Sequence, residues 1–231
     1  MVLHAMPHAT GSPKWREREF LLPSPTVISF VNYKGGVGKT TLAVETAVAV
    51  AAWDNVRVLL CDLDPQTNAT FYLFNPDDWK KWAEDGETLL SLFDAEVSDR
   101  PLPDLGKLIH PWSYSSTSRA TVSIDVLPSH IELMPMDLRL AVRYGAEGSD
   151  AVSILRTALA TLGDRYEVVI CDCPPNMGLV TQNALVASDK YVVVAMPEYL
   201  STLGIETLCG AVETLSRRVS TAAAKSRFGW F

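Results

Sequence analysis

Short apolar runs recur along the chain, and β-branched or long aliphatic side chains dominate them. Continuous runs of this length, separated by polar or glycine-rich segments, are typical of strands that are buried on both faces of a sheet. The predicted strands are Thr26–Asn32, Val56–Asp64, Thr121–Leu127, Glu167–Cys173 and Tyr191–Met196.

Between these runs, apolar residues recur at helical spacing. The predicted helices are Thr40–Trp53, Gly86–Ala95, Ser149–Leu162, Leu179–Ala187 and Thr202–Arg218. Alternating strands and helices predict parallel strands joined by right-handed crossovers, so we expect an α/β fold with a doubly wound, mostly parallel sheet. Residues 101–119 are rich in Pro, Ser and Thr, and we expect them to form a loop.

The composition is that of a globular protein, with 231 residues of which 48% are hydrophobic and 20% charged. Residues 1–25 contain several prolines and no sustained period, which favours a flexible arm before one domain over residues 26–231. The formal net charge of −7 means that contact with nucleic acid would need a local basic patch. No apolar stretch approaches the roughly 20 residues that span a bilayer, and no secretory signal is evident, so we expect a cytoplasmic protein.

The cysteines offer a metal or redox site as an alternative interpretation. Cys171 and Cys173 lie two residues apart in a predicted strand, Cys61 lies in another strand, and Cys209 lies in a predicted helix. No second Cys or His pair has the spacing of zinc ligands, so packed thiols are favoured.

The segment KGGVGKTT, at Lys34–Thr41, lies between the first predicted strand and the first predicted helix. Glycines let a backbone fold tightly around phosphates with its N–H groups turned inward, and a helix N-terminus adds a favourable dipole. Lys39 could reach the β- and γ-phosphates, and the Thr40 hydroxyl could bind Mg²⁺. The motif deviates from the usual phosphate-binding loop, because Tyr33 stands where that pattern has glycine.

Asp62 and Asp64 end the second predicted strand at i, i+2 spacing. Their carboxylates are therefore expected on one side of the strand's carboxyl end, where ligands bind in open α/β sheets. A solvated pair of aspartates is the alternative. Asp172 likewise follows an apolar run, an arrangement in which a carboxylate holds a water of the Mg²⁺ sphere.

The glycine-rich segment resembles the deviant Walker A box of the ParA/MinD superfamily of ATPases. The resemblance covers roughly residues 26–215 and is closest to partition ATPases of the ParA and Soj type. Four further segments carry it: VLLCDLDPQTNAT at Val58–Thr70, VLPSHIELMPMDLRL at Val126–Leu140, VVICDCPP at Val168–Pro175 and TQNAL at Thr181–Leu185.

This resemblance implies a P-loop NTPase fold and a site for ATP and Mg²⁺. The implied nucleotide-binding residues are Lys34, Gly35, Gly36, Val37, Gly38, Lys39, Thr40 and Thr41, with Pro197 and Glu198 near the adenine. The implied metal residues are Thr40, Asp62 and Asp172. In catalysis, Lys34 would reach the phosphates of a dimer partner and Asp64 would position the attacking water.

The implied function is slow ATP hydrolysis in chromosome or plasmid partition, by a nucleoid-associated protein that dimerises with ATP. A ParB-like protein would activate hydrolysis, and nonspecific DNA would bind in the ATP state. Arg217, Arg218 and Lys225 are candidate contacts to DNA phosphates, although a solvated helix end explains them equally well.

Members of the family continue beyond residue 218 with a further strand, which the ending SRRVSTAAAKSRFGWF does not match. We therefore expect a domain that is shortened at its C-terminal end. The alternatives are a MinD-like membrane regulator, a metabolic relative such as an amidoligase or iron–sulfur reductase, and an inactive remnant. The membrane alternative is weaker, because residues 219–231 show no clear apolar stripe.

Overall fold

A six-stranded sheet forms the centre of the molecule. The computed structural model describes residues 25–54, 56–115, 121–145, 150–196 and 199–225. Its strands lie in the order β3-β4-β2-β5-β1-β6, and all neighbours run parallel except β3 and β4. The strands are β1 (Thr26–Val31), β2 (Val58–Asp62), β3 (His110–Tyr114), β4 (Val122–Leu127), β5 (Val168–Asp172) and β6 (Lys190–Val193). The predicted α/β class with a mostly parallel sheet is confirmed.

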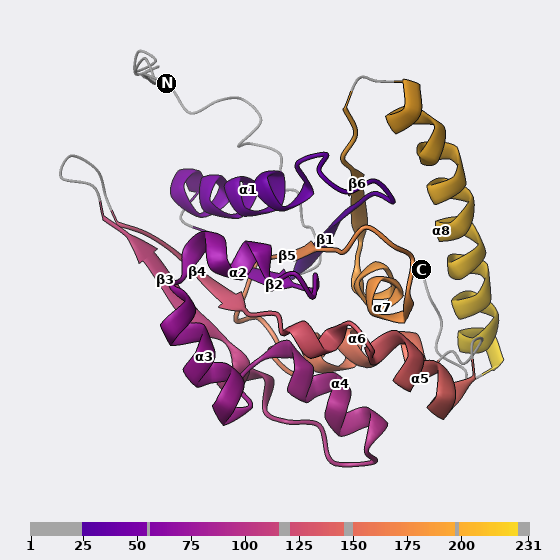
Figure 1. Cartoon of the computed structure of the whole chain (residues 1–231), viewed down its shortest axis with the longest axis horizontal. Coiled ribbons are helices and arrows are strands. Elements are labelled where there is room, and N and C mark those ends of the chain that lie inside the picture. The colour runs from indigo at the N-terminus through magenta and orange to yellow at the C-terminus, as the bar shows by residue number, and fades with distance from the viewer. Residues whose placement is uncertain (1–24, 55, 116–120, 146–149, 197–198, 226–231) are drawn as a thin grey trace.

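Helices cover both faces of this sheet (Figure 1). They are α1 (Lys39–Asp54), α2 (Asn68–Leu73), α3 (Pro76–Asp85), α4 (Leu89–Val97), α5 (Met136–Tyr144), α6 (Ile154–Ala160), α7 (Leu179–Ala187) and α8 (Tyr199–Lys225). Among the described residues, the short 3-10 helices are η2 (Leu105–Leu108), η3 (Ile131–Leu133) and η4 (Asp150–Val152).

The two faces of the sheet have separate apolar cores. On one face, α1 packs through small residues such as Ala43 and Ala47, both fully buried, which let the helix lie close to the strands. On the other face, larger side chains from α4, α6 and α7, such as Phe93, Leu155 and Leu179, form the second core. Burial on both faces explains why β2 and β5 are apolar up to the aspartate that ends each strand.

The expected loop over residues 101–119 is wrong in part, because it contains η2 and β3. β3 has the sequence HPWSY and pairs antiparallel with β4 at the edge of the sheet. An edge strand needs only one row of backbone hydrogen bonds, so Pro111 is tolerated in β3. Most side chains of β3 are exposed. For this reason the polar, proline-containing sequence did not predict a strand here.

The region before β3 also holds more helix than the sequence predicted. The helix expected over Gly86–Ala95 begins only at Leu89, and Gly86 instead ends α3 with a φ of 73°. α3 has no buried residue, and its apolar residues, two tryptophans and an alanine, are half-buried; Asn75 caps its N-terminus and Pro76 is its first residue. The Asn-Pro pair and the helical spacing of these apolar residues were the available sequence signals for α3.

Other predicted boundaries shift by a few residues. The helix expected over Ser149–Leu162 divides into η4 and α6, and the helix expected over Thr202–Arg218 extends to Tyr199–Lys225 as α8. α5 lies in a segment that carried no helix prediction. Of the expected arm over residues 1–25, only Pro25 lies within the described residues.

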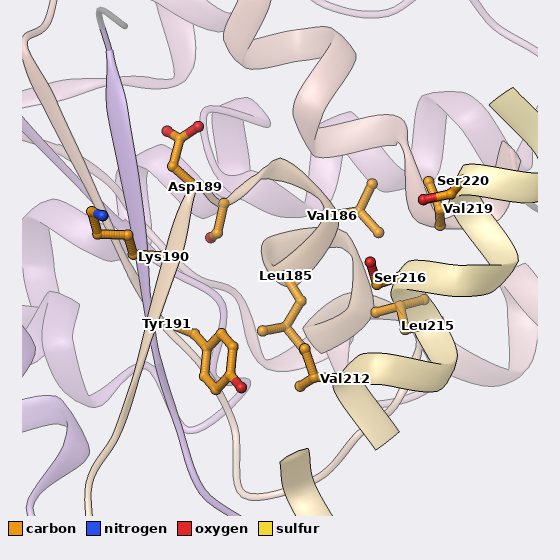
Figure 2. Close-up of a pocket in the computed structure, with 11 residues that line it drawn as sticks. Leu185, Val186, Asp189, Lys190, Tyr191, Val212, Leu215, Ser216, Val219 and Ser220 are labelled. Carbon is orange, nitrogen blue, oxygen red and sulfur yellow. The ribbon is translucent and has the colours of Figure 1, made fainter. Parts of the chain in front are cut away.

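Within the described residues β6 forms one edge of the sheet, and a cavity lies between this edge and α8. The cavity measures about 340 Å³ and lies between the end of α7, the start of β6 and α8. Figure 2 shows Leu185 and Val186 on one side of it and Val212, Leu215 and Val219 on the other. In the described residues β6 pairs only with β1, and its Tyr191 and Val192 keep about two fifths of their surface exposed.

The buried cysteines pack within the sheet. Cys61 and Cys171 are neighbours across β2 and β5, Cys173 follows, and all three are free thiols without exposed surface. Burial raises the pKa of Cys173, which disfavours the thiolate that binds metals. These observations agree with the interpretation of packed thiols.

Asp137 on α5 caps the N-terminus of α7, because its Oδ1 accepts a 2.9 Å hydrogen bond from the Val180 backbone N–H. A Cβ at Gly178 would collide with the same carboxylate. We predict that Asp137→Ala and Gly178→Ala each lower the free energy of unfolding by about 1–2 kcal/mol, since both remove this cap. Urea denaturation of the double variant should show a loss well below the sum; additive losses would contradict the shared mechanism.

Candidate phosphate-binding site

The segment Lys34–Thr41 forms a loop that joins β1 to the N-terminus of α1. Gly36 and Gly38 have φ values of 74° and 92°, a region that side chains with a Cβ disfavour. A Cβ added at Gly35, Gly36 or Gly38 would meet no described heavy atom within 4 Å. The loop therefore leaves open space next to its backbone, and the first turn of α1 opens into it.

A cavity of about 660 Å³ lies over this loop, a size that suits a small-molecule ligand. The loop supplies one wall, and the segment after β2 supplies the other through Asp64, Gln66 and Asn68. Two aromatic residues of α2, Phe71 and Tyr72, also line it. The sequence pattern did not single out these aromatic residues; their position seven and eight residues beyond Asp64 was the available signal.

Lys39 lies at the base of the cavity and is only 6% exposed. Its Nζ donates a 3.2 Å hydrogen bond to the backbone carbonyl of Lys34, so the side chain curls back over the loop. Burial lowers the pKa of Lys39, and the carboxylates of Asp172 and Asp64 oppose that shift. The structure thus brings a buried cation together with two predicted carboxylates.

Asp172, the last residue of β5, is fully buried, and neither of its carboxylate oxygens has a hydrogen-bond partner among the described residues. Burial raises its pKa to about 7, while the nearby Thr40 hydroxyl and the Lys39 ammonium oppose the rise. A buried carboxylate without a partner is costly unless a cation compensates it. This orphaned group fits a role in holding Mg²⁺.

The described residues contain no cluster of three or more His, Cys, Asp or Glu side chains that could hold a metal ion. Mg²⁺ commonly keeps several waters and binds through one or two carboxylates together with phosphates of the ligand. The donor set of Asp172 and the Thr40 hydroxyl therefore suits a magnesium ion that arrives with a nucleotide.

Asp62 and Asp64 have different surroundings. The Asp62 carboxylate is fully buried and accepts hydrogen bonds from the Thr70 backbone N–H at 2.9 Å, the Thr70 hydroxyl at 2.7 Å and the Asp64 N–H at 3.2 Å. Burial, with a contribution from the neighbouring Asp172 carboxylate, raises the pKa of Asp62 to about 8. Asp64 lines the cavity, and its Oδ1 accepts from the Gln66 N–H at 2.9 Å.

For the remaining residues that the sequence predicted for the site or for DNA binding, the structure gives fewer contacts. The Lys34 backbone N–H donates to Asn32 Oδ1 at 3.1 Å, at the start of the loop. Pro197 and Glu198 lie outside the described residues, as does the side chain of Lys225.

The two described arginines near the end of α8 differ in accessibility. The side chain of Arg217 is 79% exposed and forms a 3.2 Å ion pair with Glu213. Arg218 instead donates a 2.6 Å hydrogen bond to Gln182 on α7. Arg217 is therefore the more accessible of the two. Within the described part of the chain, no helix is both long and apolar enough to cross a bilayer.

A family model described as an AAA domain matches residues 25–224. The chain is 32% identical over 195 residues to the sporulation initiation inhibitor protein Soj of Bacillus subtilis, an alignment that covers 84% of this chain and 68% of Soj. It is 31% identical over 191 residues to the chromosome partitioning protein ParA of Myxococcus xanthus, covering 83% of this chain and 59% of that protein. The chain thus spans about three fifths to two thirds of the length of these relatives.

Solved structures show the same fold. A structure named as cobyrinic acid a,c-diamide synthase from Mycobacterium smegmatis, with bound ADP and magnesium, has a TM-score of 0.61 and 29% identity and covers 84% of this chain and 69% of its own. A plasmid partition protein from Borrelia burgdorferi bound to AMPPNP has a TM-score of 0.64 at 22% identity, covering 83% and 71% of the two chains. With its glycine-rich loop and buried carboxylates in the corresponding fold, the chain belongs to the AAA-domain family of ParA- and Soj-type P-loop ATPases.

Proposed function

We propose that the chain binds ATP with Mg²⁺ in the cavity over the Lys34–Thr41 loop and hydrolyses it. The observation that carries this proposal is the buried, unpartnered Asp172 carboxylate opposite Lys39 and the N-terminus of α1. A triphosphate suits the loop and the lysine, and its magnesium ion suits the carboxylate. The relative with bound ADP and magnesium supports the same assignment.

Each residue then has a role that its surroundings allow. The backbone of residues 35–41 would surround the phosphates, Lys39 would bind the β- and γ-phosphates, and Thr40 and Asp172 would hold Mg²⁺. Asp62 would support the metal shell from behind, because its own oxygens already accept hydrogen bonds. Asp64, at the cavity wall, would position the attacking water.

We further propose that the chain works in partition, as a dimer that forms with ATP and binds nonspecific DNA. The names of Soj-type and ParA relatives support this assignment. Lys34 would reach the phosphates of the partner subunit, a ParB-like protein would activate hydrolysis, and the protein would associate with the nucleoid. Arg217 is the best placed cation for DNA phosphates, since the formal net charge of −7 disfavours most other surfaces.

DNA retention on a filter, measured with ATP and with ADP at increasing salt, tests the partition role. We expect retention with ATP only, weakening as salt rises. Arg217→Ala should weaken binding and reduce the slope of log affinity against log salt by about 1, since one phosphate contact is lost. Lys81→Ala is a matched control, because Lys81 is also an exposed helical cation paired with an acid on its own helix. Equal losses in both variants, or no ATP dependence, would count against the proposal.

A second candidate is an ATP-dependent amide-forming ligase, which the biosynthetic name of the Mycobacterium smegmatis relative favours. Such an enzyme releases phosphate only when a carboxylate acceptor is activated. Phosphate release from ATP without any acceptor, and its stimulation by DNA, would favour the partition ATPase.

A further inference from the structure

The short segment between β4 and η3 is bonded to the segment that carries Asp62 and Asp64. Ser129, in this short segment, has no exposed surface. Its hydroxyl donates a 2.6 Å hydrogen bond to the Asp64 backbone carbonyl, and its N–H donates to the Thr70 hydroxyl oxygen at 3.2 Å. The residue therefore bonds both ends of the segment that leads from β2 into α2.

The Thr70 hydroxyl continues this network in one direction. It has a single proton, which it donates to Asp62 Oδ2, so it can only accept from the Ser129 N–H. The direction of these hydrogen bonds is thus fixed from Ser129 through Thr70 to the Asp62 carboxylate. All three residues are fully buried, so water cannot replace a lost partner without rearrangement.

The turn that follows Asp64 is strained and needs such support. Thr67 has a φ of 60°, a left-handed conformation that is unfavourable for a β-branched residue. Within the turn, the Thr67 N–H donates to the Asp64 carbonyl at 2.8 Å, the Gln66 N–H to Asp64 Oδ1 at 2.9 Å and the Thr67 hydroxyl to the Pro65 carbonyl at 3.2 Å. The hydrogen bond from the Ser129 hydroxyl, by contrast, ties the Asp64 carbonyl to a different part of the chain.

Ser129 is itself held from the outer side. Its carbonyl accepts a 2.9 Å hydrogen bond from Trp79 Nε1 on α3. The Trp79 ring packs edge-on against Phe71 of α2 and lies tilted over His130. Ser129 is therefore held between the segment that carries Asp64 and the surface helix α3.

We propose that Ser129 is a positioning residue for ATP hydrolysis: by holding the Asp64 carbonyl it fixes the direction in which the Asp64 carboxylate faces the cavity. This role rests on the proposed function. Binding of ATP depends on the loop and Lys39, which Ser129 does not touch, so loss of its hydroxyl affects the hydrolytic step and leaves nucleotide binding intact.

Steady-state kinetics of Ser129→Ala test this role. We expect kcat to fall about 10- to 100-fold, the effect of misplacing a reacting group by a fraction of an ångström to an ångström. KM and the ATP dissociation constant should stay within about twofold of the wild type, since binding contacts remain. Ser91→Ala is the matched control, because the Ser91 hydroxyl also donates at 2.6 Å to a backbone carbonyl, that of Gly86, away from the site.

Two further measurements separate positioning from stability. Thr70→Ser keeps the hydroxyl that accepts from the Ser129 N–H and donates to Asp62, so it should retain most of the wild-type kcat. Hydrogen exchange of residues 62–70 without nucleotide should be faster in Ser129→Ala and unchanged in Ser91→Ala.

The role is overturned if Ser129→Ala keeps the wild-type kcat, or if kcat and ATP affinity fall together in proportion to a lower melting temperature. Wild-type protein that retains no ATP would overturn the proposed function and this role with it. An active wild type with an equally active Ser129→Ala variant would overturn the role of Ser129 alone.

Discussion

Replacing Lys39 with alanine is expected to abolish ATP retention, with a loss of affinity of at least about 100-fold. The side chain is 6% exposed at the base of the cavity, with its ammonium held at the Lys34 carbonyl and near Asp172 and Asp64. A buried cation that meets the phosphates contributes several charge-assisted hydrogen bonds, each stronger than a neutral one. Its removal also leaves two carboxylates facing the phosphates without compensation. Isothermal titration with ATP and Mg²⁺ measures the loss directly.

Lys80→Ala is a suitable control, because Lys80 is an exposed lysine on α3 away from the cavity. The control should bind ATP as the wild type does. Both variants should show the same far-ultraviolet circular dichroism, so that the loss in Lys39→Ala is attributable to the site. Unchanged ATP affinity in Lys39→Ala would remove the main support for a nucleotide at this loop.

The sequence predicted the central sheet well, for a physical reason. β2 and β5 are buried on both faces, so each is a continuous apolar run up to its terminal aspartate, and such a run is easily recognised in the sequence. β3 and α3 give the opposite case. Four of the five β3 residues are exposed or half-buried, so β3 carries no clear strand period, and the few apolar residues of the short helix α3 are only half-buried. Their positions follow instead from pairing with β4 and from aromatic contacts, such as Trp82 stacked on His110 at 3.9 Å.

The loop Lys34–Thr41 could be found from sequence because its chemistry is local: glycines, lysine and threonine lie at fixed spacing within eight residues. The different environments of Asp62 and Asp64 could not be found from their spacing, because they depend on how the segment up to Thr70 folds back and on the neighbouring strand β5. The i, i+2 spacing predicted two carboxylates on one side, but Thr70 engages Asp62 while Asp64 remains at the cavity wall. The contact of Ser129 with Asp64 spans 65 positions, and no local pattern encodes it.

Asp172→Asn is expected to have opposite effects on the free and the nucleotide-bound protein. Because burial raises the pKa of Asp172 to about 7, the folded state binds more protons than the unfolded state between about pH 4 and pH 7. The free energy of unfolding of the ligand-free wild type therefore falls as pH rises through this window. Asparagine removes the buried charge, so at pH 8 the ligand-free variant should be more stable by roughly 2–4 kcal/mol, or about 2–4 °C in melting temperature for each kcal/mol.

In the same variant, Mg²⁺ should no longer increase the stabilisation of the protein by bound ATP, since a neutral amide is a poor partner for that ion. Melting temperatures of the wild type and Asp172→Asn, measured at pH 5 and pH 8 with and without Mg²⁺ and ATP, test both effects. Asp77→Asn, a change at an exposed carboxylate on α3, should alter neither. A ligand-free Asp172→Asn protein that melts below the wild type at pH 8 would show that Lys39 already compensates the buried charge. If Mg²⁺ raises the melting temperature of the ATP-bound variant as much as that of the wild type, the ion binds elsewhere. The reason is that the proposed magnesium site rests on the buried Asp172 carboxylate, whose oxygens have no hydrogen-bond partner among the described residues.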